Sequence, residues 1–479
     1  MAQTASAMLR DIRQQIVGLD VQIPLLNGST CQAINFDNAA STPALRSVLD
    51  TVTTFMSWYS SVHRGAGFKS RVATQAYEDA REVVGQLLGA RGDQHVVIFG
   101  KNTTEAINKL ARRIAFRPSD VVLSSLMEHH SNDLPWRGVA TVAHIHVDAL
   151  GHLDEDHFAA LLHQYAGRVR LVAISGGSNV TGAIAPIHRL AELSHASGAE
   201  IFVDCAQLAP HRAIDIGALD DPAHLDYVAL SGHKVYAPFG SGALIGRRAT
   251  FAQGTPEYIG GGTVEIVTPT EVTWAAPPDR DEAGSPNVVG AVALAAALEA
   301  LDSIDMDLIA AHEAELTTHA LRRLAEVPGL RLYGDGDPQR AGTRLGVIPF
   351  TLAKVPHVLV AAILSAEFGI AVRNGSFCAQ PYLSQLLGIS AAELARAHAE
   401  LQAGDRHNLP GLVRVSFGMY NTIAEVDTLV AALDCIARGD YRGEYVQNYV
   451  TGDYQPKGWN PDLGGYFRIT ANERSGAAC

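Results

Sequence analysis

The sequence predicts an α/β protein with a large domain, built on a mostly parallel sheet of about seven strands, and a smaller α+β domain after it. Two observations predict this fold. Short apolar runs alternate with helical patterns through the middle of the chain, which is typical of a parallel sheet covered by helices on both faces. The length of 479 residues also exceeds what one simple core accommodates.

The expected strands of the large domain are apolar runs rich in β-branched residues. They lie at 95–99, 120–124, 141–147, 169–174, 199–204, 226–231 and 241–246. Helical periodicity is clearest at 74–90, 154–165 and 186–197, and the alanine-rich run Val288 to Leu298 reads as a packed helix. The Pro/Gly-rich link between the last two strands leaves no room for a helix, so the final strand should be antiparallel.

A second region begins near residue 305 and predicts the small domain. We expect helices at 305–327, 356–368 and 423–437, with strands at 329–333, 345–350, 370–373 and 412–416. The predicted boundaries are an N-terminal segment (1–34) that joins the small domain, the large domain (35–304), the small domain (305–438) and a C-terminal arm (439–479). The arm lacks periodicity but is rich in aromatic residues, so we expect an irregular segment whose residues 440–470 pack on the body, near the active-site mouth or a dimer interface.

Composition excludes several classes of function. The net charge of −13 argues against nucleic acid as a partner, because phosphate neutralisation needs clustered Lys and Arg. The segment Met1–Arg10 lacks the pattern of a secretory signal, and no apolar run is long enough to span a bilayer. The five cysteines are scattered without metal-finger spacing, which favours a reducing, cytoplasmic setting over a disulfide framework.

A lysine and an aspartate stand at the ends of two predicted strands. Lys234 closes the tetrapeptide Ser-Gly-His-Lys directly after the run 227–230, and Asp204 ends the run 201–203. A lone lysine after a strand is most often a solvated surface residue. Paired with such an aspartate, it matches the needs of pyridoxal phosphate (PLP): an amine for the Schiff base and a carboxylate that keeps the pyridine nitrogen protonated.

A phosphate site is expected beside them. The sequence Gly-Lys-Asn-Thr-Thr-Glu at 100–105 follows a strand and opens a helix, so free backbone N–H groups and the hydroxyls of Thr103 and Thr104 form an anion cup. The simpler alternative is that Asn102 or Thr103 only caps the helix. Ser231 and His233 would complete the cup.

His129 follows the strand 120–124 and is placed to stack on a pyridine ring. Adjacent histidines such as His129 and His130 are otherwise surface residues or part of a metal site. No third ligand has suitable spacing, so we expect no metal.

From about Asn35 to residue 437 the chain resembles the class V (fold-type I) PLP-dependent aminotransferase family, in particular its group II cysteine desulfurases and selenocysteine lyases. The motifs that carry the resemblance are, in order, Asn35-Phe-Asp-Asn-Ala-Ala40, Val62-His63-Arg64-Gly65, Thr103-Thr104-Glu105-Ala106-Ile107-Asn108, Glu128-His129-His130, Ser178-Asn179, Asp204-Cys-Ala-Gln207, Ser231-Gly-His-Lys234, Gly260-Gly-Gly262, Glu282-Ala-Gly-Ser-Pro-Asn287, Arg373-Asn-Gly-Ser-Phe-Cys378, Arg414 and Met419-Tyr420-Asn421-Thr422.

The resemblance implies a role for each of these residues in binding the cofactor. Lys234 would bind PLP, Asp204 would pair with the pyridinium nitrogen, Gln207 would contact the ring hydroxyl and His129 would stack on the ring and take part in catalysis. Thr104, Ser231 and His233 would hold the phosphate. The family is dimeric, and Ser285 would reach the phosphate of the neighbouring subunit.

The resemblance also implies the chemistry. Arg414 and Asn179 would bind the substrate α-carboxylate, with Arg373 and His63 as further substrate-binding residues. Cys378 would attack the sulfur of bound cysteine, leaving a protein persulfide and releasing alanine. A sulfur-acceptor protein would then take up the persulfide sulfur. The alternative for Cys378 is a small buried apolar cysteine. The sequence departs from many relatives in Ser376-Phe377, where they carry a histidine, and in Gly176-Gly177.

Three functions therefore remain to be compared. The leading one is desulfuration of L-cysteine by a homodimer, with selenocysteine as an alternative substrate. The second is a specialised class V lyase, epimerase or aminotransferase that acts on another amino acid. The third is a catalytically idle PLP-binding partner protein, against which the full set of Lys234, Asp204, His129 and Arg414 argues.

Overall fold

The computed structural model describes residues 11–469. The segment Met1–Arg10, where no secretory signal is expected, and Cys479 lie outside the described residues. Between these limits, no helix combines the length and the apolar character that crossing a membrane requires.

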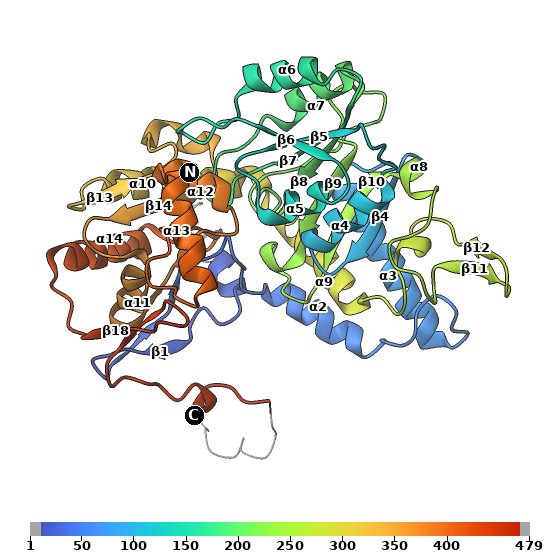
Figure 1. The fold of residues 1–479 in the computed structure, drawn as a ribbon. Coiled ribbons are helices and arrows are strands. Elements are labelled where there is room, and N and C mark those ends of the chain that lie inside the picture. The colour runs from blue at the N-terminus through green and yellow to red at the C-terminus, as the bar shows by residue number, and fades with distance from the viewer. Residues whose placement is uncertain (1–10, 470–479) are drawn as a thin grey trace.

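A seven-stranded sheet forms the centre of the larger half of the molecule (Figure 1). In their order across the sheet the strands are β4 (His95–Gly100), β10 (Gly242–Arg247), β9 (Tyr227–Ser231), β8 (Glu200–Asp204), β7 (Val169–Ser175), β5 (Val121–Ser125) and β6 (Thr141–Ile145). The last five of these strands are parallel, and β10 runs antiparallel to both of its neighbours. The predicted seven-stranded sheet, with an antiparallel final strand, is confirmed.

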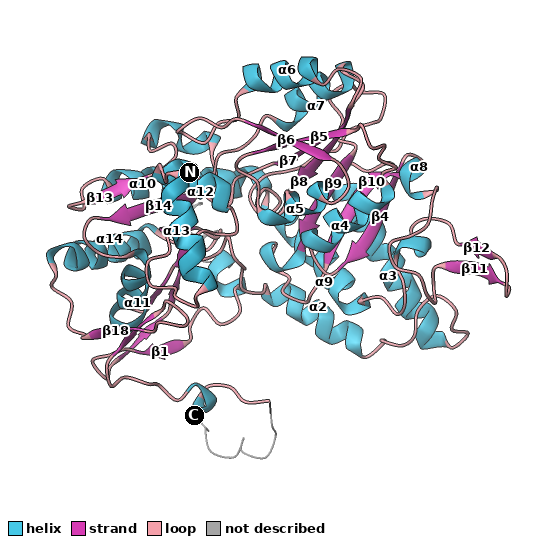
Figure 2. Cartoon of the chain, viewed as in Figure 1, coloured by secondary structure: helices cyan, strands magenta, loops and turns pink. Residues whose placement is uncertain are grey.

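Helices cover both faces of this sheet because its strands are apolar on both sides (Figure 2). In β4, Val97 and Phe99 join the core on one face, whereas Val96 and Ile98 join the core on the other. The helices of the first core are α2 (Arg46–Met56), α3 (Phe68–Leu87), α6 (Glu155–Gln164), α7 (Ile187–Ala196) and α9 (Val288–Ile304). Those of the second are α4 (Thr103–Arg113), α5 (Leu134–Arg137) and α8 (Arg248–Phe251).

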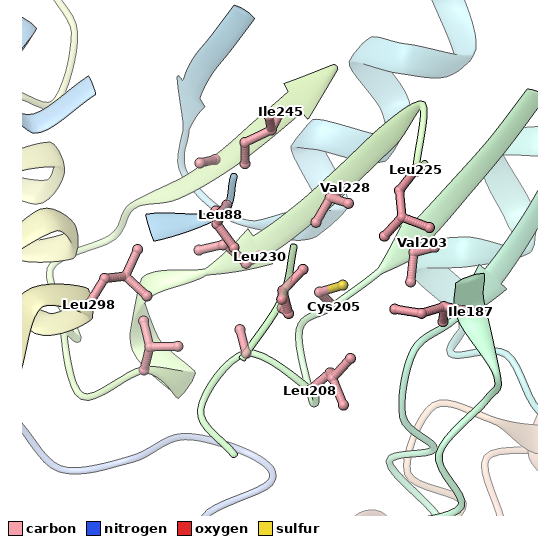
Figure 3. Packing of buried hydrophobic residues seen from close by; sticks show 14 of the residues in the cluster. Leu88, Ile187, Val203, Cys205, Leu208, Leu225, Val228, Leu230, Ile245 and Leu298 are labelled. Carbon is pink, nitrogen blue, oxygen red and sulfur yellow. The ribbon is translucent and has the colours of Figure 1, made fainter. Parts of the chain in front are cut away.

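The first core continues from the strands to the loops that carry the site. Figure 3 shows Val203 on β8, Val228 and Leu230 on β9, and Cys205 and Leu208 just beyond β8, packed together. Cys205 is fully buried among these apolar side chains, as expected for a structural cysteine. The packing fixes where the ends of β8 and β9 lie.

A four-stranded antiparallel sheet forms the centre of the smaller half. Its order is β13 (Leu330–Leu332), β14 (Val347–Leu352), β17 (Leu412–Ser416) and β16 (Arg373–Gly375), and the helices of its core are α10 (Met306–Leu324), α11 (His357–Phe368) and α14 (Ile423–Arg438). The single strand expected at 370–373 is two strands, because its halves have different partners. β15 (Ile370–Ala371) pairs in parallel with β3 (Ile34–Asn35), whereas β16 pairs with β17.

The start of the described chain lies against the smaller half. The hairpin of β1 (Gln22–Pro24) and β2 (Thr30–Gln32) is followed by β3, and the Leu26 N–H donates to the carbonyl of Ala366 in α11.

The division into domains at 34/35, 304/305 and 438/439 stays a prediction. The other elements of the chain are β11 (Val264–Val267), β12 (Val272–Trp274), α12 (Gln380–Leu387) and α13 (Ala391–Gln402).

The sequence predicts an irregular C-terminal arm, but part of the arm is regular. β18 (Tyr445–Gln447) and β19 (Tyr454–Pro456) form an antiparallel hairpin. The sequence of these strands has no alternation of apolar and polar residues that would predict it. The carboxylate of Glu367 on α11 accepts hydrogen bonds from the N–H groups of Arg442 and Gly443 and from the hydroxyl of Tyr445. Beyond β19 the chain leads away from the body (Figure 1). The arm is therefore packed on α11 at its start, whereas most of its residues from 457 to 469 are exposed.

Candidate active site

A cavity of about 250 Å³ lies at the carboxyl ends of the parallel strands, where residues of both halves of the molecule meet. All but two of the predicted site residues line it. They are Thr103, Thr104, His129, Asn179, Asp204, Gln207, Ser231, His233, Lys234, Arg373, Cys378 and Arg414. The sequence positions that were expected to converge are therefore brought together.

Lys234 stands in a short turn directly after β9, facing Asp204 at the end of β8. Burial lowers the pKa of Lys234 to about 8, against the opposing effect of Asp204. Burial raises the pKa of Asp204, and the Ala206 N–H and Lys234 oppose that rise. A lysine with a lowered pKa has an accessible neutral amine near neutral pH, which is the nucleophilic form.

The N-terminus of α4 opens onto the same cavity. Asn102 caps the helix, because its side-chain oxygen accepts from the Glu105 N–H, so the capping role and the anion cup coexist. The Thr103 N–H donates to the Ser231 hydroxyl oxygen at 2.9 Å, and the two hydroxyls are 2.8 Å apart. This contact joins the helix N-terminus to the strand that carries Lys234, and it suits a phosphate group.

His129 lines the cavity with its ring in a defined tautomer. Its Nδ1 accepts a hydrogen bond from the Ser131 N–H at 3.1 Å, so the neutral ring carries its proton on Nε2. Burial, followed by the charge of Lys234, lowers the pKa of His129 to about 4. The ring is therefore neutral at physiological pH and presents an N–H group.

Glu128 precedes His129 and holds this segment by hydrogen bonds, a role that was not predicted from the sequence. Its buried carboxylate accepts hydrogen bonds from the hydroxyls of Ser125 and Ser175 and from the side-chain amide of Asn132. Burial raises the pKa of Glu128 to about 7, although these hydrogen bonds oppose the rise. Only its place beside His129 in the sequence could have indicated a supporting role.

Arg414 is buried in the middle of β17 and is held by two neighbours. Its Nη2 donates to Oδ1 of Asp37 and its Nη1 to the carbonyl of Asn179, both at 2.9 Å. Its Nε has no hydrogen-bond partner. The ring centroid of Phe377 lies 4.8 Å from the guanidinium carbon, a cation–π contact. A buried guanidinium that still has a free N–H can bind a carboxylate.

Asp37 is a site residue that sequence reasoning missed, although it lies inside the motif at 35–40. Its second carboxylate oxygen is 3.7 Å from Nη1 of Arg373, so the aspartate lies between two guanidinium groups. It fixes Arg414 from one side and keeps Arg373 nearby.

Cys378 is exposed and lies on a strained turn, so the alternative of a buried apolar cysteine is wrong. The Ala379 N–H donates to the carbonyl of Ser376, and the two central residues, Phe377 and Cys378, both have a φ of 54°. Positive φ at both central residues is typical of type I′ turns, which favour Gly and Asn. For other residues the left-handed conformation costs about 1–2 kcal/mol each. Other contacts must therefore hold the thiol where it is.

Ser285 and His63 lie outside this cavity. Ser285 lines a second cavity of about 210 Å³, together with Gly100 and Lys101 on the other side of the α4 N-terminus. His63 is exposed, and its ring contacts Tyr77 edge-on with ring centroids 5.7 Å apart. Within one chain these two residues therefore do not reach the predicted substrate site.

One group of side chains has the composition of a metal site. His195, His224 and Asp226 place their ligand atoms within 4.8 Å of one another, at the edge of the sheet opposite to the cavity. The Asp226 carboxylate already accepts from the Ile201 N–H and from Arg247, as well as contacting both histidines. These donors satisfy the carboxylate without an ion.

The cavity fits the cofactor that the resemblance implies. It combines a lysine amine with a lowered pKa, a buried carboxylate at a neighbouring strand end and a helix N-terminus with hydroxyl groups. These are the three groups that a protonated pyridine, an aldehyde and a phosphate require.

Comparison with known proteins agrees with this geometry. A cysteine desulfurase of Dickeya dadantii is 38% identical over 413 residues, which cover 84% of this chain and 91% of the relative. The solved structure of a cysteine desulfurase from Thermococcus onnurineus is similar with a TM-score of 0.76 and 30% identity, covering 90% of this chain and 98% of the other. The Escherichia coli cysteine desulfurase CsdA, in its S-sulfonic acid form, has a TM-score of 0.72 and 31% identity, covering 91% and 99%.

The family assignment itself rests on most of the chain. The sequence pattern described as Aminotransferase class-V matches residues 34–429, which include every site residue discussed above. The chain belongs to the class-V aminotransferase family.

Proposed function

We propose that this protein is a PLP-dependent cysteine desulfurase that converts L-cysteine to L-alanine and keeps the sulfur as a persulfide on Cys378. The observation that carries the proposal is the exposed Cys378 thiol in the same cavity as Lys234, Asp204 and Arg414. The similarity to proteins named cysteine desulfurase supports it. The rival, a class V enzyme that acts on another amino acid, has no comparable support.

The residues divide the work as follows. Lys234 would hold the cofactor and move protons at the substrate carbon atoms, Asp204 would pair with the ring nitrogen and Gln207 would contact the ring hydroxyl. When bound, PLP acts as an electron sink for the substrate. Thr103, Thr104, Ser231 and His233, which line the same cavity, would hold its phosphate.

The substrate α-carboxylate binds to Arg414, with the side chain of Asn179 and the more exposed Arg373 beside it. The Cys378 thiolate attacks the substrate sulfur, so that an S–S bond forms as the C–S bond breaks, and the electron pair left on carbon takes up a proton. His129 lines the cavity and its neutral ring carries the proton on Nε2, so it is placed to stack on the cofactor ring and to donate a proton to the substrate carbon. Alanine leaves and the persulfide sulfur passes to an acceptor protein.

We further propose a homodimer, because two predicted site residues, Ser285 and His63, lie outside the chain's own cavity. Exposed apolar side chains occur near His63 in the sequence and on strand β11. They include Trp58, Phe68, Ile266 and Val267. Arg64 donates to the Val264 carbonyl and thereby ties the His63 loop to the β11–β12 hairpin. Sedimentation of the purified protein tests the homodimer, and a monomer at micromolar concentration would contradict it.

A cytoplasmic location remains a proposal from the scattered cysteines.

The test of the function is a single incubation with L-cysteine. Wild-type protein should gain one sulfur atom on the peptide that contains Cys378 and should release alanine, measured by mass spectrometry and amino-acid analysis. Cys378→Ala should still change the cofactor absorption band on addition of L-cysteine, because the binding residues remain, but should release little alanine. Selenocysteine is the alternative substrate to assay beside it. If the variant releases alanine from L-cysteine as fast as the wild type, the desulfurase proposal fails.

A further inference from the structure

The turn that carries Cys378 is held from outside, and two of the contacts that hold it come from one residue. The His130 N–H donates to the Cys378 carbonyl at 2.7 Å. The ring Nε2 of His130 accepts a hydrogen bond from the Gln380 N–H at 3.2 Å. One histidine thus fixes the carbonyl of Cys378 itself and the amide two residues later.

The contact with Gln380 meets a specific need of the chain. Gln380 is the first residue of α12, and the first N–H groups of a helix have no acceptor within the helix. The preceding residue, Ala379, makes no side-chain cap. The imidazole of His130 therefore acts as an external cap that attaches α12 to the loop after β5.

The ring of His130 must be neutral to accept this hydrogen bond. Burial lowers its pKa, although Asp133 opposes the effect. The acceptor form therefore persists at neutral pH.

His130 does not reach the place of reaction. Its two neighbours in sequence, His129 and Ser131, line the cavity, whereas His130 is turned away towards α12. A third contact completes the arrangement, because the side-chain amide of Asn179 donates to the Phe377 carbonyl at 2.7 Å. The strained turn and the residue directly after it are consequently held by three hydrogen bonds, two of which belong to His130.

We propose that His130 is a positioning residue for the nucleophile: it staples the turn at 376–379 so that the Cys378 thiol stays within reach of the substrate sulfur. This inference rests on the proposed function. A misplacement of about 1 Å costs on the order of a hundredfold in rate, so the turn needs such a support even though His130 touches no reacting atom.

The test compares two variants of the holoenzyme. In His130→Ala, hydrogen exchange of the peptide that includes Gln380 should be faster than in wild type. The single-turnover rate of alanine release from L-cysteine should fall about tenfold to a hundredfold, while KM and the cofactor band change little. His130→Gln is the matched control. Its side-chain oxygen can accept from the Gln380 N–H, so it should recover slow exchange and most of the rate.

The outcomes separate this inference from the proposed function. Wild-type exchange in His130→Ala would overturn it, and so would fast exchange with an unchanged rate of alanine release. It would also fall if His130→Gln behaved like His130→Ala in both measurements. If wild-type protein releases no alanine from L-cysteine, the proposed function fails, whereas the exchange of the Gln380 amide still reports whether His130 holds the turn.

Discussion

Replacement of Arg414 by alanine should weaken the binding of L-cysteine strongly, because this buried guanidinium lines the cavity and its Nε has no hydrogen-bond partner. Loss of one partner from a buried charged hydrogen-bond pair costs about 2–5 kcal/mol. The Arg414 charge is already partly balanced by Asp37 at 2.9 Å, so the lower half of that range applies. About 2–3 kcal/mol corresponds to a roughly 30- to 150-fold increase in the apparent dissociation constant.

The assay is a titration of the cofactor absorption band with two ligands. L-Cysteine carries the α-carboxylate, and cysteamine has the same amine and thiol without it. The variant should bind cysteamine nearly as well as wild type does, because cysteamine has no carboxylate for Arg414 to bind. Arg373→Ala is the matched control. Its side chain is 57% exposed and 3.7 Å from Asp37, so the expected loss is at most about 1 kcal/mol. Equal weakening of cysteine and cysteamine in Arg414→Ala would refute the assignment of the carboxylate site.

Two further predictions concern stability. Burial alone would raise the pKa of Glu313, but His211, Arg212 and the Gly346 N–H lower it to about 2. A carboxyl group whose pKa is lower in the folded than in the unfolded state stabilises the fold at pH values above its unfolded pKa of 4.5. Glu313→Gln should therefore lower the free energy of unfolding by about 3 kcal/mol at pH 7. In urea unfolding the difference should shrink as the pH falls from about 4.5 towards 2, and a difference that does not change with pH would contradict it. In Glu367→Ala, trypsin should cleave after Arg442 at least about tenfold faster, because Glu367 holds the arm with three hydrogen bonds. Glu444→Ala is the control. It removes an exposed carboxylate paired with Lys457 and should not speed this cleavage.

The parts of the site that could be predicted are those encoded within a few residues. Asp204 ends an apolar run and Lys234 follows another in the turn directly after it, and a run of this kind marks both the strand and the edge at which it ends. The antiparallel course of β10 followed from the shortness of the link before it.

The parts that could not be predicted depend on contacts between distant positions. Asp37 and Arg414 are 377 residues apart, and His130 and Gln380 are 250 apart, so nothing near either residue indicates its partner. The hairpin of the arm was missed for a different reason. Its strands are three residues each and do not alternate between buried and fully exposed positions, which removes the usual signal of a strand.

The pairing of β3 with β15 has a consequence for the order in which the protein is made. A nascent chain that ends before Arg373 already contains the whole seven-stranded sheet and Lys234, but neither Cys378 nor Arg414. Because domains generally fold as units from the N-terminus during synthesis, the lysine and the phosphate cup can form first. Ile34 and Asp37 must wait for Ile370 and Arg414 to leave the ribosome before they find their partners. Cys378 and Arg414 are therefore added last to a cavity in which Lys234 and the phosphate cup can already be in place.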